Sequence, residues 1–244
     1  MQAVLYVAHG SRVKAGLEEA IEFIKTVKPM IDLPIQEICF LELAEPSILQ
    51  GVTACVEKGA TNIAVIPILL LSANHAKQDI PLEIEKAKTN YPFVSFSIGS
   101  PLGIHEKLID SLHKRVVEAD STIQSEDVEV LLIGRGSSDN SVQHDLQQIA
   151  DNLKIQYHYA NVNICFLYGN GPSFDEVLQQ LTVNKSNKQI FMIPYILFTG
   201  LLKLGIQKKI VQQGIEKVVL CNCLGYDENV RDVLIERIKE TIAV

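Results

Sequence analysis

The sequence predicts an α/β protein made of two similar lobes, each a mostly parallel sheet with flanking helices. Three observations support this prediction. Short apolar, β-prone runs alternate with segments of helical periodicity along the chain. A polar and charged stretch at 118–127 interrupts this alternation near the middle of the 244 residues. The second half then repeats residue patterns of the first half at a nearly constant spacing, which indicates an internal duplication.

The first series of elements opens with the apolar run 4–8, which predicts a strand that ends at the loop residues His9, Gly10 and Ser11. A helical pattern follows at once, and the same alternation continues to residue 119. The predicted strands are 4–8, 35–41, 63–71 and 93–98, and the predicted helices are 17–27, 47–58, 81–89 and 104–119.

The second series begins after the polar stretch and repeats the order of the first. Its predicted strands are 128–133, 162–167, 190–198 and 218–220, and its predicted helices are 173–181 and 228–242. We therefore expect an N-terminal lobe at 1–122 and a C-terminal lobe at 123–244.

Matched residues support the duplication directly. Residues 4–11 align with 130–137 at an offset of 126, and residues 38–41 are identical to 164–167 at the same offset. Pro67 aligns with Pro194 at an offset of 127, one residue more. Two lobes related in this way predict a pseudo-two-fold arrangement with a cleft between them.

Charge and composition exclude several classes of protein. Acidic residues outnumber basic ones, 29 to 22, and no local basic stripe stands against the net charge of −7, so we expect no nucleic-acid partner. The longest apolar run, 63–71, is far shorter than the roughly 20 residues of a membrane span. The chain opens without a secretory leader and has five cysteines with no Cys-x-x-Cys pair, so we expect a cytoplasmic protein with reduced thiols.

Three ionisable residues follow successive predicted strands of the first half: His9, Glu42 and His75. Because ligands of parallel sheets bind at the carboxyl ends of the strands, we expect these side chains to converge. Two imidazoles and a carboxylate would form a site for a borderline divalent metal with open coordination positions. Taken singly, each residue also has a simpler interpretation, such as a backbone-bonded loop histidine or a helix cap.

The second half lacks these ionisable residues at the aligned positions, where Arg135, Tyr168 and Leu202 occur instead. Neither half contains a Gly-x-Gly-x-x-Gly or Walker-type phosphate loop, so nucleotide binding has no support. A Gly-x-Ser-x-Gly nucleophile elbow is also missing, which argues against covalent catalysis.

These residues resemble the class II chelatases of modified tetrapyrrole synthesis, in the long duplicated form that includes sirohydrochlorin ferrochelatase. The resemblance covers essentially the whole chain. It is carried by Val7-Ala8-His9-Gly10-Ser11-Arg12, by the block 40–47 around Glu42, by 67–70 followed by His75, and by 194–200 in the second half.

The resemblance implies insertion of Fe²⁺ into sirohydrochlorin to give sirohaem, with the metal as a substrate and no permanently bound cofactor. It implies that His9 and His75 bind the incoming metal, that Glu42 assists, and that the second lobe is catalytically silent. Short members of this family form homodimers that long members imitate within one chain, so we expect a monomer. Sirohydrochlorin carries many carboxylates, which need local cations, hydroxyls and backbone N–H groups. The candidate binding residues are Ser11, Arg12, Ser47, Lys77, Arg135 and Ser137.

The residues leave several alternatives open. The same site could insert cobalt for cobalamin synthesis, or nickel as a third choice, because nitrogen and oxygen ligands alone do not select between these metals. The cleft could also belong to a cytosolic tetrapyrrole or metal carrier without turnover, or the histidines could be coincidental in a structural protein.

Overall fold

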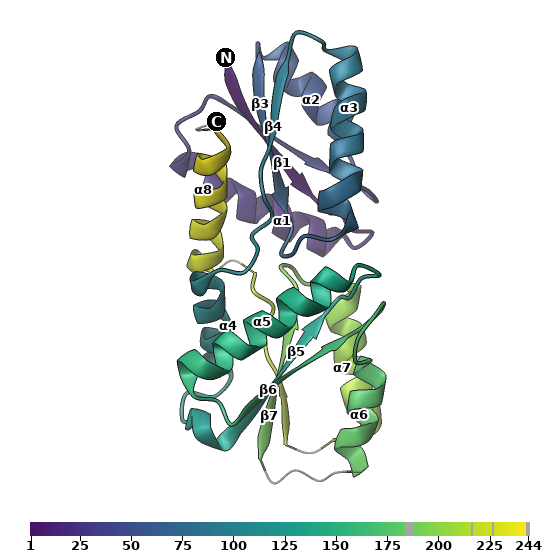
Figure 1. Ribbon diagram of the computed structural model, residues 1–244, viewed down its shortest axis with the longest axis vertical. Helices are drawn as coiled ribbons and strands as arrows, with labels where there is room; N and C mark the ends of the chain where they lie inside the picture. Colours follow the sequence, from purple (N-terminus) through teal and green to yellow (C-terminus); the bar gives the residue numbers. More distant parts are fainter. Residues whose placement is uncertain (184–187, 216, 226, 243–244) are drawn as a thin grey trace. The chain divides into compact units, whose positions relative to one another are not determined.

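The computed structural model describes residues 1–183, 188–215, 217–225 and 227–242, and its elements are drawn in Figure 1. Contacts between residues divide the chain into two compact units. Unit 1 comprises Met1–Gly103 and Val230–Val244, and unit 2 comprises Ile104–Asn229.

Unit 1 is built on a four-stranded parallel sheet in the order β2-β1-β3-β4. Residues 3–8 of the central strand β1 are all buried, as expected for a parallel strand covered on both faces. One layer of its core joins Leu5 and Val7 to residues of α2 and α3. The elements of this sheet and its helices are β1 (Gln2–Ala8), α1 (Lys14–Val27), η1 (Lys28–Met30), β2 (Ile35–Phe40), α2 (Ile48–Glu57), β3 (Asn62–Ile68), η2 (His75–Asp79), α3 (Ile80–Asn90) and β4 (Ser95–Ile98).

Unit 2 repeats this topology with a parallel sheet in the order β6-β5-β7-β8. Its elements are α4 (Glu106–Ala119), η3 (Ser125–Asp127), β5 (Val128–Gly134), α5 (Asn140–Tyr157), β6 (Asn161–Phe166), α6 (Phe174–Val183), β7 (Gln189–Tyr195), α7 (Leu201–Gln213) and β8 (Val218–Leu220). The predicted α/β fold with a duplicated parallel sheet is therefore confirmed. Within the described part of the chain, no helix has the length and apolar character needed to cross a membrane.

The largest differences between the predicted and observed elements are two strands that end early and two helices that were not predicted. The strand predicted at 63–71 ends at Ile68, and that predicted at 190–198 ends at Tyr195. The helices α5 and α7 were not among the predicted elements. Helix α7 buries only Ile206 among its thirteen residues, so its sequence carries little of the apolar periodicity that reveals a helix.

The two units exchange the last helix of each sequence repeat. Helix α4 ends the first repeat but belongs to unit 2, whereas residues 230–242 of α8 (Glu228–Ile242) end the second repeat but belong to unit 1. The compact units therefore do not follow the boundary predicted between residues 122 and 123, which remains a proposal for the limits of the two sequence repeats. Sequence similarity between the repeats cannot reveal such an exchange, because along the chain each repeat still ends with its own helix.

Two equivalent arginines fix the exchanged helices. Arg115 of α4 donates from Nη2 to the carbonyl oxygen of Leu224 at 2.6 Å. Arg237 of α8 donates from Nη2 to the carbonyl oxygen of Leu102 at 3.0 Å. The two arginines are 122 residues apart, and so are the two leucines. Each of the two helices therefore makes the same contact with the other sequence repeat. Buried carbonyl groups need such donors, because an unsatisfied one costs about 1–3 kcal/mol.

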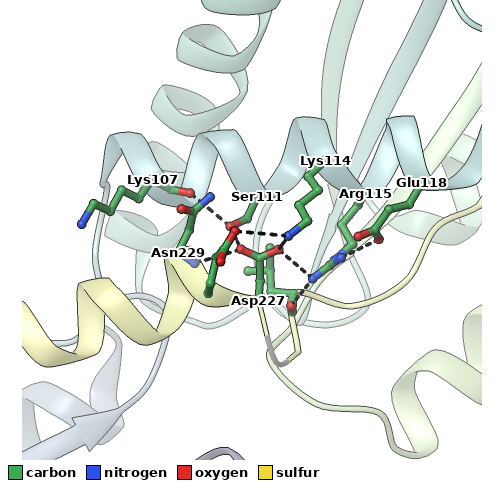
Figure 2. Close-up of polar contacts among 9 residues, drawn as sticks. Lys107, Ser111, Lys114, Arg115, Glu118, Asp227 and Asn229 are labelled. Carbon is green, nitrogen blue, oxygen red and sulfur yellow. Dashed lines mark hydrogen bonds and ion pairs between the residues drawn. The ribbon is translucent and has the colours of Figure 1, made fainter. Parts of the chain in front are cut away.

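Asp227, at the start of α8, forms the centre of a buried polar cluster in unit 2 (Figure 2). Its carboxylate accepts from Ser111 Oγ at 2.9 Å and pairs with Lys114 at 3.0 Å and Arg115 at 3.2 Å. It also accepts from the backbone N–H of Asn229 at 3.0 Å, so that it caps α8. Burial raises the pKa of Asp227, but the hydrogen bonds from Lys114 and Ser111 outweigh it and hold the pKa below its usual value.

Candidate metal centre

Three potential metal ligands lie at the carboxyl edge of the unit 1 sheet. His9 directly follows β1, Glu42 comes two residues after β2, and His75 opens the turn η2 beyond β3. Strand β1 lies between β2 and β3 in the sheet, so the ends of these three strands are neighbours. The side chains expected to converge therefore do so.

The three side chains are close enough to share one ion. His9 Nδ1 lies 3.5 Å from Glu42 Oε1, and the His9 and His75 rings meet edge to face with centroids 4.7 Å apart. One ligand atom from each residue lies within 4.8 Å of the others. Two ligands of a single ion at about 2.1 Å are at most about 4.2 Å apart, so closure by less than 1 Å or so would complete the site. Exposed fractions of 26% for His9, 43% for Glu42 and 27% for His75 leave the site accessible.

Gly10 brings the loops that carry His9 and Glu42 together. Its backbone has a φ of +96°, and a Cβ added there would lie 1.8 Å from the carbonyl oxygen of Glu42. The backbone N–H of Glu42 donates to the carbonyl oxygen of His9 at 3.1 Å. Only glycine allows this approach at this φ, so Gly10 sets the separation of two potential ligands.

His75 is oriented by a carboxylate that sequence reasoning did not select. Its Nδ1 lies 2.7 Å from Oδ2 of Asp79, four residues further along the same turn. A carboxylate only accepts, so Nδ1 donates and Nε2 keeps its lone pair for a metal. The spacing of four residues between a histidine and an aspartate near a strand end could have indicated this pair.

The candidate substrate residues of unit 1 differ in how their side chains are engaged. Ser11 Oγ accepts from the backbone N–H of Val13 at 3.0 Å. Ser47 caps α2 in a reciprocal arrangement, accepting from the Gln50 N–H while Gln50 Oε1 accepts from the Ser47 N–H. Arg12 and Lys77 are exposed and lie close in sequence to His9 and His75.

Unit 2 has the same loop backbone with different side chains. A Cβ at Gly136 would lie 1.7 Å from the carbonyl oxygen of Tyr168. The backbone N–H of Tyr168 donates to the carbonyl oxygen of Arg135 at 3.0 Å. Arg135 is exposed, and Ser137 Oγ accepts from the backbone N–H of Asp139 at 3.0 Å. Among the residues that the structure describes, the group of His, Cys, Asp or Glu side chains close enough to hold a metal ion is the one in unit 1. The two repeats thus share the geometry of the loop but not its chemistry.

The chain is similar to chelatases over its full length. It is 45% identical to a sirohydrochlorin ferrochelatase from Priestia megaterium, over 100% of this chain and 91% of that protein. It is 36% identical to a sirohydrochlorin cobaltochelatase from Priestia megaterium, over 98% of this chain and 80% of that protein.

A solved structure of SirB from Bacillus subtilis with Fe³⁺ matches with a TM-score of 0.90 and 42% identity, covering 99% of this chain and 96% of that one. The family model CbiX matches twice, at residues 3–119 and 129–241, in agreement with the two repeats of the sequence. These matches, together with the duplicated sheet, show that the chain belongs to the CbiX family as a long member with two repeats.

Proposed function

We propose that this protein is a sirohydrochlorin ferrochelatase, which inserts Fe²⁺ into sirohydrochlorin to form sirohaem. The observation that carries the proposal is the cluster of His9, Glu42 and His75 at one sheet edge, in a chain 45% identical to a sirohydrochlorin ferrochelatase. Two imidazoles and a carboxylate suit a borderline divalent ion such as Fe²⁺.

The mechanism follows from the openness of this site. His9 and His75 bind the incoming ion and leave coordination positions for the pyrrole nitrogens. As the ring takes over the metal, its two pyrrole N–H groups lose their protons, so one divalent ion enters for two protons released. Glu42 is the exposed carboxylate beside His9 and accepts one of these protons, and the other passes to solvent water at this accessible site. Imidazoles release the metal more readily than thiolates, and all five cysteines are buried.

The substrate's carboxylates need positive partners on a protein of net charge −7. Lys77 and Arg12, both exposed, provide cations close in sequence to His75 and His9. Ser11 and Ser47 add hydroxyls at the same sheet edge, and their hydroxyl hydrogens are left to donate because each oxygen accepts locally. Arg135 and Ser137, at the aligned positions of the second repeat, remain predicted substrate-binding residues.

The second repeat is catalytically silent in this proposal, because Arg135, Tyr168 and Leu202 offer no pair of imidazoles. It serves to bind the tetrapyrrole. A monomeric state, a cytoplasmic location and the lack of a permanently bound cofactor remain predictions.

Cobalt is the second candidate metal. The relative named as a sirohydrochlorin cobaltochelatase is 36% identical to this chain, and the same three ligands accept Co²⁺. Insertion of Co²⁺ would direct the product to cobalamin instead of sirohaem. A carrier would use the same residues but would bind each ion once without turnover.

An anaerobic absorbance assay tests the proposal. The purified protein is mixed with excess sirohydrochlorin and either Fe²⁺ or Co²⁺ at matched concentrations, and the spontaneous rate is subtracted. We expect many insertions per protein molecule, with a higher kcat/KM for Fe²⁺. A higher value for Co²⁺ would assign the protein to cobalt insertion. If each chain yields only one equivalent of product or bound metal, the protein is a carrier and not an enzyme.

A further inference from the structure

The contact between Asp79 and His75 lies inside a short π-helical turn. The backbone N–H of Ile80 donates to the carbonyl oxygen of His75, five residues earlier, which closes this wide turn around Asp79. Ile80 is fully buried in the core of unit 1 and anchors the end of the turn. Turns of this type are uncommon in helices and occur frequently at functional sites.

The second repeat has one residue fewer than the first in the segment that contains the turn. Before the turn, Pro67 aligns with Pro194 at an offset of 127 residues. After it, the core residues Ile80 and Ile84 correspond to Ile206 and Ile210 at an offset of 126. The first repeat therefore has one residue more in this segment, and a π-helical turn accommodates one extra residue without displacing the buried face of the helix.

The same comparison links the extra residue to the metal site. Helix α7 occupies this place in unit 2 and contains neither histidine, aspartate nor glutamate within Leu201–Gln213. The repeat without an imidazole at position 202 therefore also has no carboxylate to orient one. Both segments join equivalent strands to equivalent helices. If Asp79 only stabilised the fold, we would expect a carboxylate in both repeats, and not only in the repeat that has the histidine.

We propose that Asp79 is a positioning residue for metal delivery. Its carboxylate accepts from His75 Nδ1, fixes the ring orientation and tautomer, and leaves Nε2 facing the incoming ion. This inference rests on the proposed role of His75 as a metal ligand. Carboxylates that hold a metal-binding histidine in this way typically contribute tenfold to 100-fold in metal affinity or activity.

The test measures binding of Co²⁺ alone to the full chain, by titration under anaerobic conditions and by the visible absorption of bound Co²⁺. Four variants are compared with the unchanged protein: Asp79→Ala, Asp79→Asn, Glu83→Ala and His75→Ala. Glu83 is the matched control, because it lies one turn further along α3 and pairs with Lys86 instead of a histidine. Asparagine keeps the shape of the side chain and an acceptor oxygen, so Asp79→Asn decides the outcome if Asp79→Ala fails to fold.

We expect Asp79→Ala to raise the dissociation constant for Co²⁺ about 10- to 100-fold and to alter the visible spectrum of bound Co²⁺. The Co²⁺ affinity of Asp79→Asn should fall between those of Asp79→Ala and the unchanged protein. In the anaerobic insertion assay, Asp79→Asn should raise KM for the metal more than it lowers kcat. The inference is overturned if both Asp79 variants bind Co²⁺ as Glu83→Ala does while His75→Ala weakens binding. If His75→Ala also binds normally, the proposed metal site itself fails, and the role of Asp79 fails with it.

Discussion

Replacement of Gly10 by alanine tests whether the loop backbone sets the distance between His9 and Glu42. The new Cβ would lie 1.8 Å from the Glu42 carbonyl oxygen, whereas real Cβ contacts shorter than 3.0 Å essentially do not occur. The two loops must therefore separate by at least about 1.2 Å, and the φ of +96° adds strain of about 1–2 kcal/mol for a residue with a side chain. A misplacement of about 1 Å can lower a rate about 100-fold.

The second repeat provides a control with the same steric problem. A Cβ at Gly136 would lie 1.7 Å from the Tyr168 carbonyl oxygen, at a φ of +90°. We expect Gly10→Ala and Gly136→Ala to lower thermal stability by similar amounts, because the clash and the strain are alike. Only Gly10→Ala should weaken binding of Co²⁺, by tenfold or more. Gly10→Ala should also lower the insertion rate about 100-fold.

The assay is a titration of each variant with Co²⁺, together with its melting temperature. Equal Co²⁺ affinity for the two variants would refute the reasoning, since the loop geometry of unit 1 would then have no special relation to the metal. Unchanged stability in both variants would show that the loops adjust without cost.

Two further predictions concern unit 2. Asp227→Ala leaves Arg115 and Lys114 without their buried partner, so we expect the free energy of unfolding, measured with urea, to fall by about 3–5 kcal/mol. The control Glu228→Ala removes an exposed carboxylate and should change this free energy little. A loss below 1 kcal/mol or so for Asp227→Ala would contradict the importance of the cluster. Burial lowers the pKa of His113, and the charge of Asp110 only partly opposes this. The unfolded chain therefore binds a proton that the folded chain does not, so stability should fall as the pH drops below about 6.5, and His113→Asn should reduce this dependence in urea titrations at pH 8 and pH 5.5.

Much of the fold follows from local patterns in the sequence. The buried runs of β1, β3, β5 and β7 are continuous and apolar, and such runs indicate central parallel strands. Helix α7 was missed because only Ile206 is buried. Helix α5 could have been predicted, because Val142, Leu146, Ile149 and Leu153 are buried and recur at helical spacing. The exchange of α4 and α8 could not be predicted, because it depends on contacts between segments about 120 residues apart.

The candidate metal ligands could be predicted because strand order alone places them together. His9, Glu42 and His75 end three neighbouring strands, and any parallel sheet brings such residues to one edge. Asp79 was missed because the predicted helix began only at residue 81, so its four-residue spacing from His75 was not interpreted as a helical contact. The predicted substrate residues Ser11 and Ser47 also stabilise a loop and a helix start, which a sequence pattern cannot separate from binding.

The most direct test of the account compares His9→Ala and His75→Ala with His144→Ala in the anaerobic insertion assay. His144 is an exposed histidine of α5, outside the cluster. We expect the first two variants to lose Fe²⁺ insertion while still binding sirohydrochlorin, and His144→Ala to retain the full rate. Insertion at an undiminished rate by either His9→Ala or His75→Ala would contradict the assignment of the metal site.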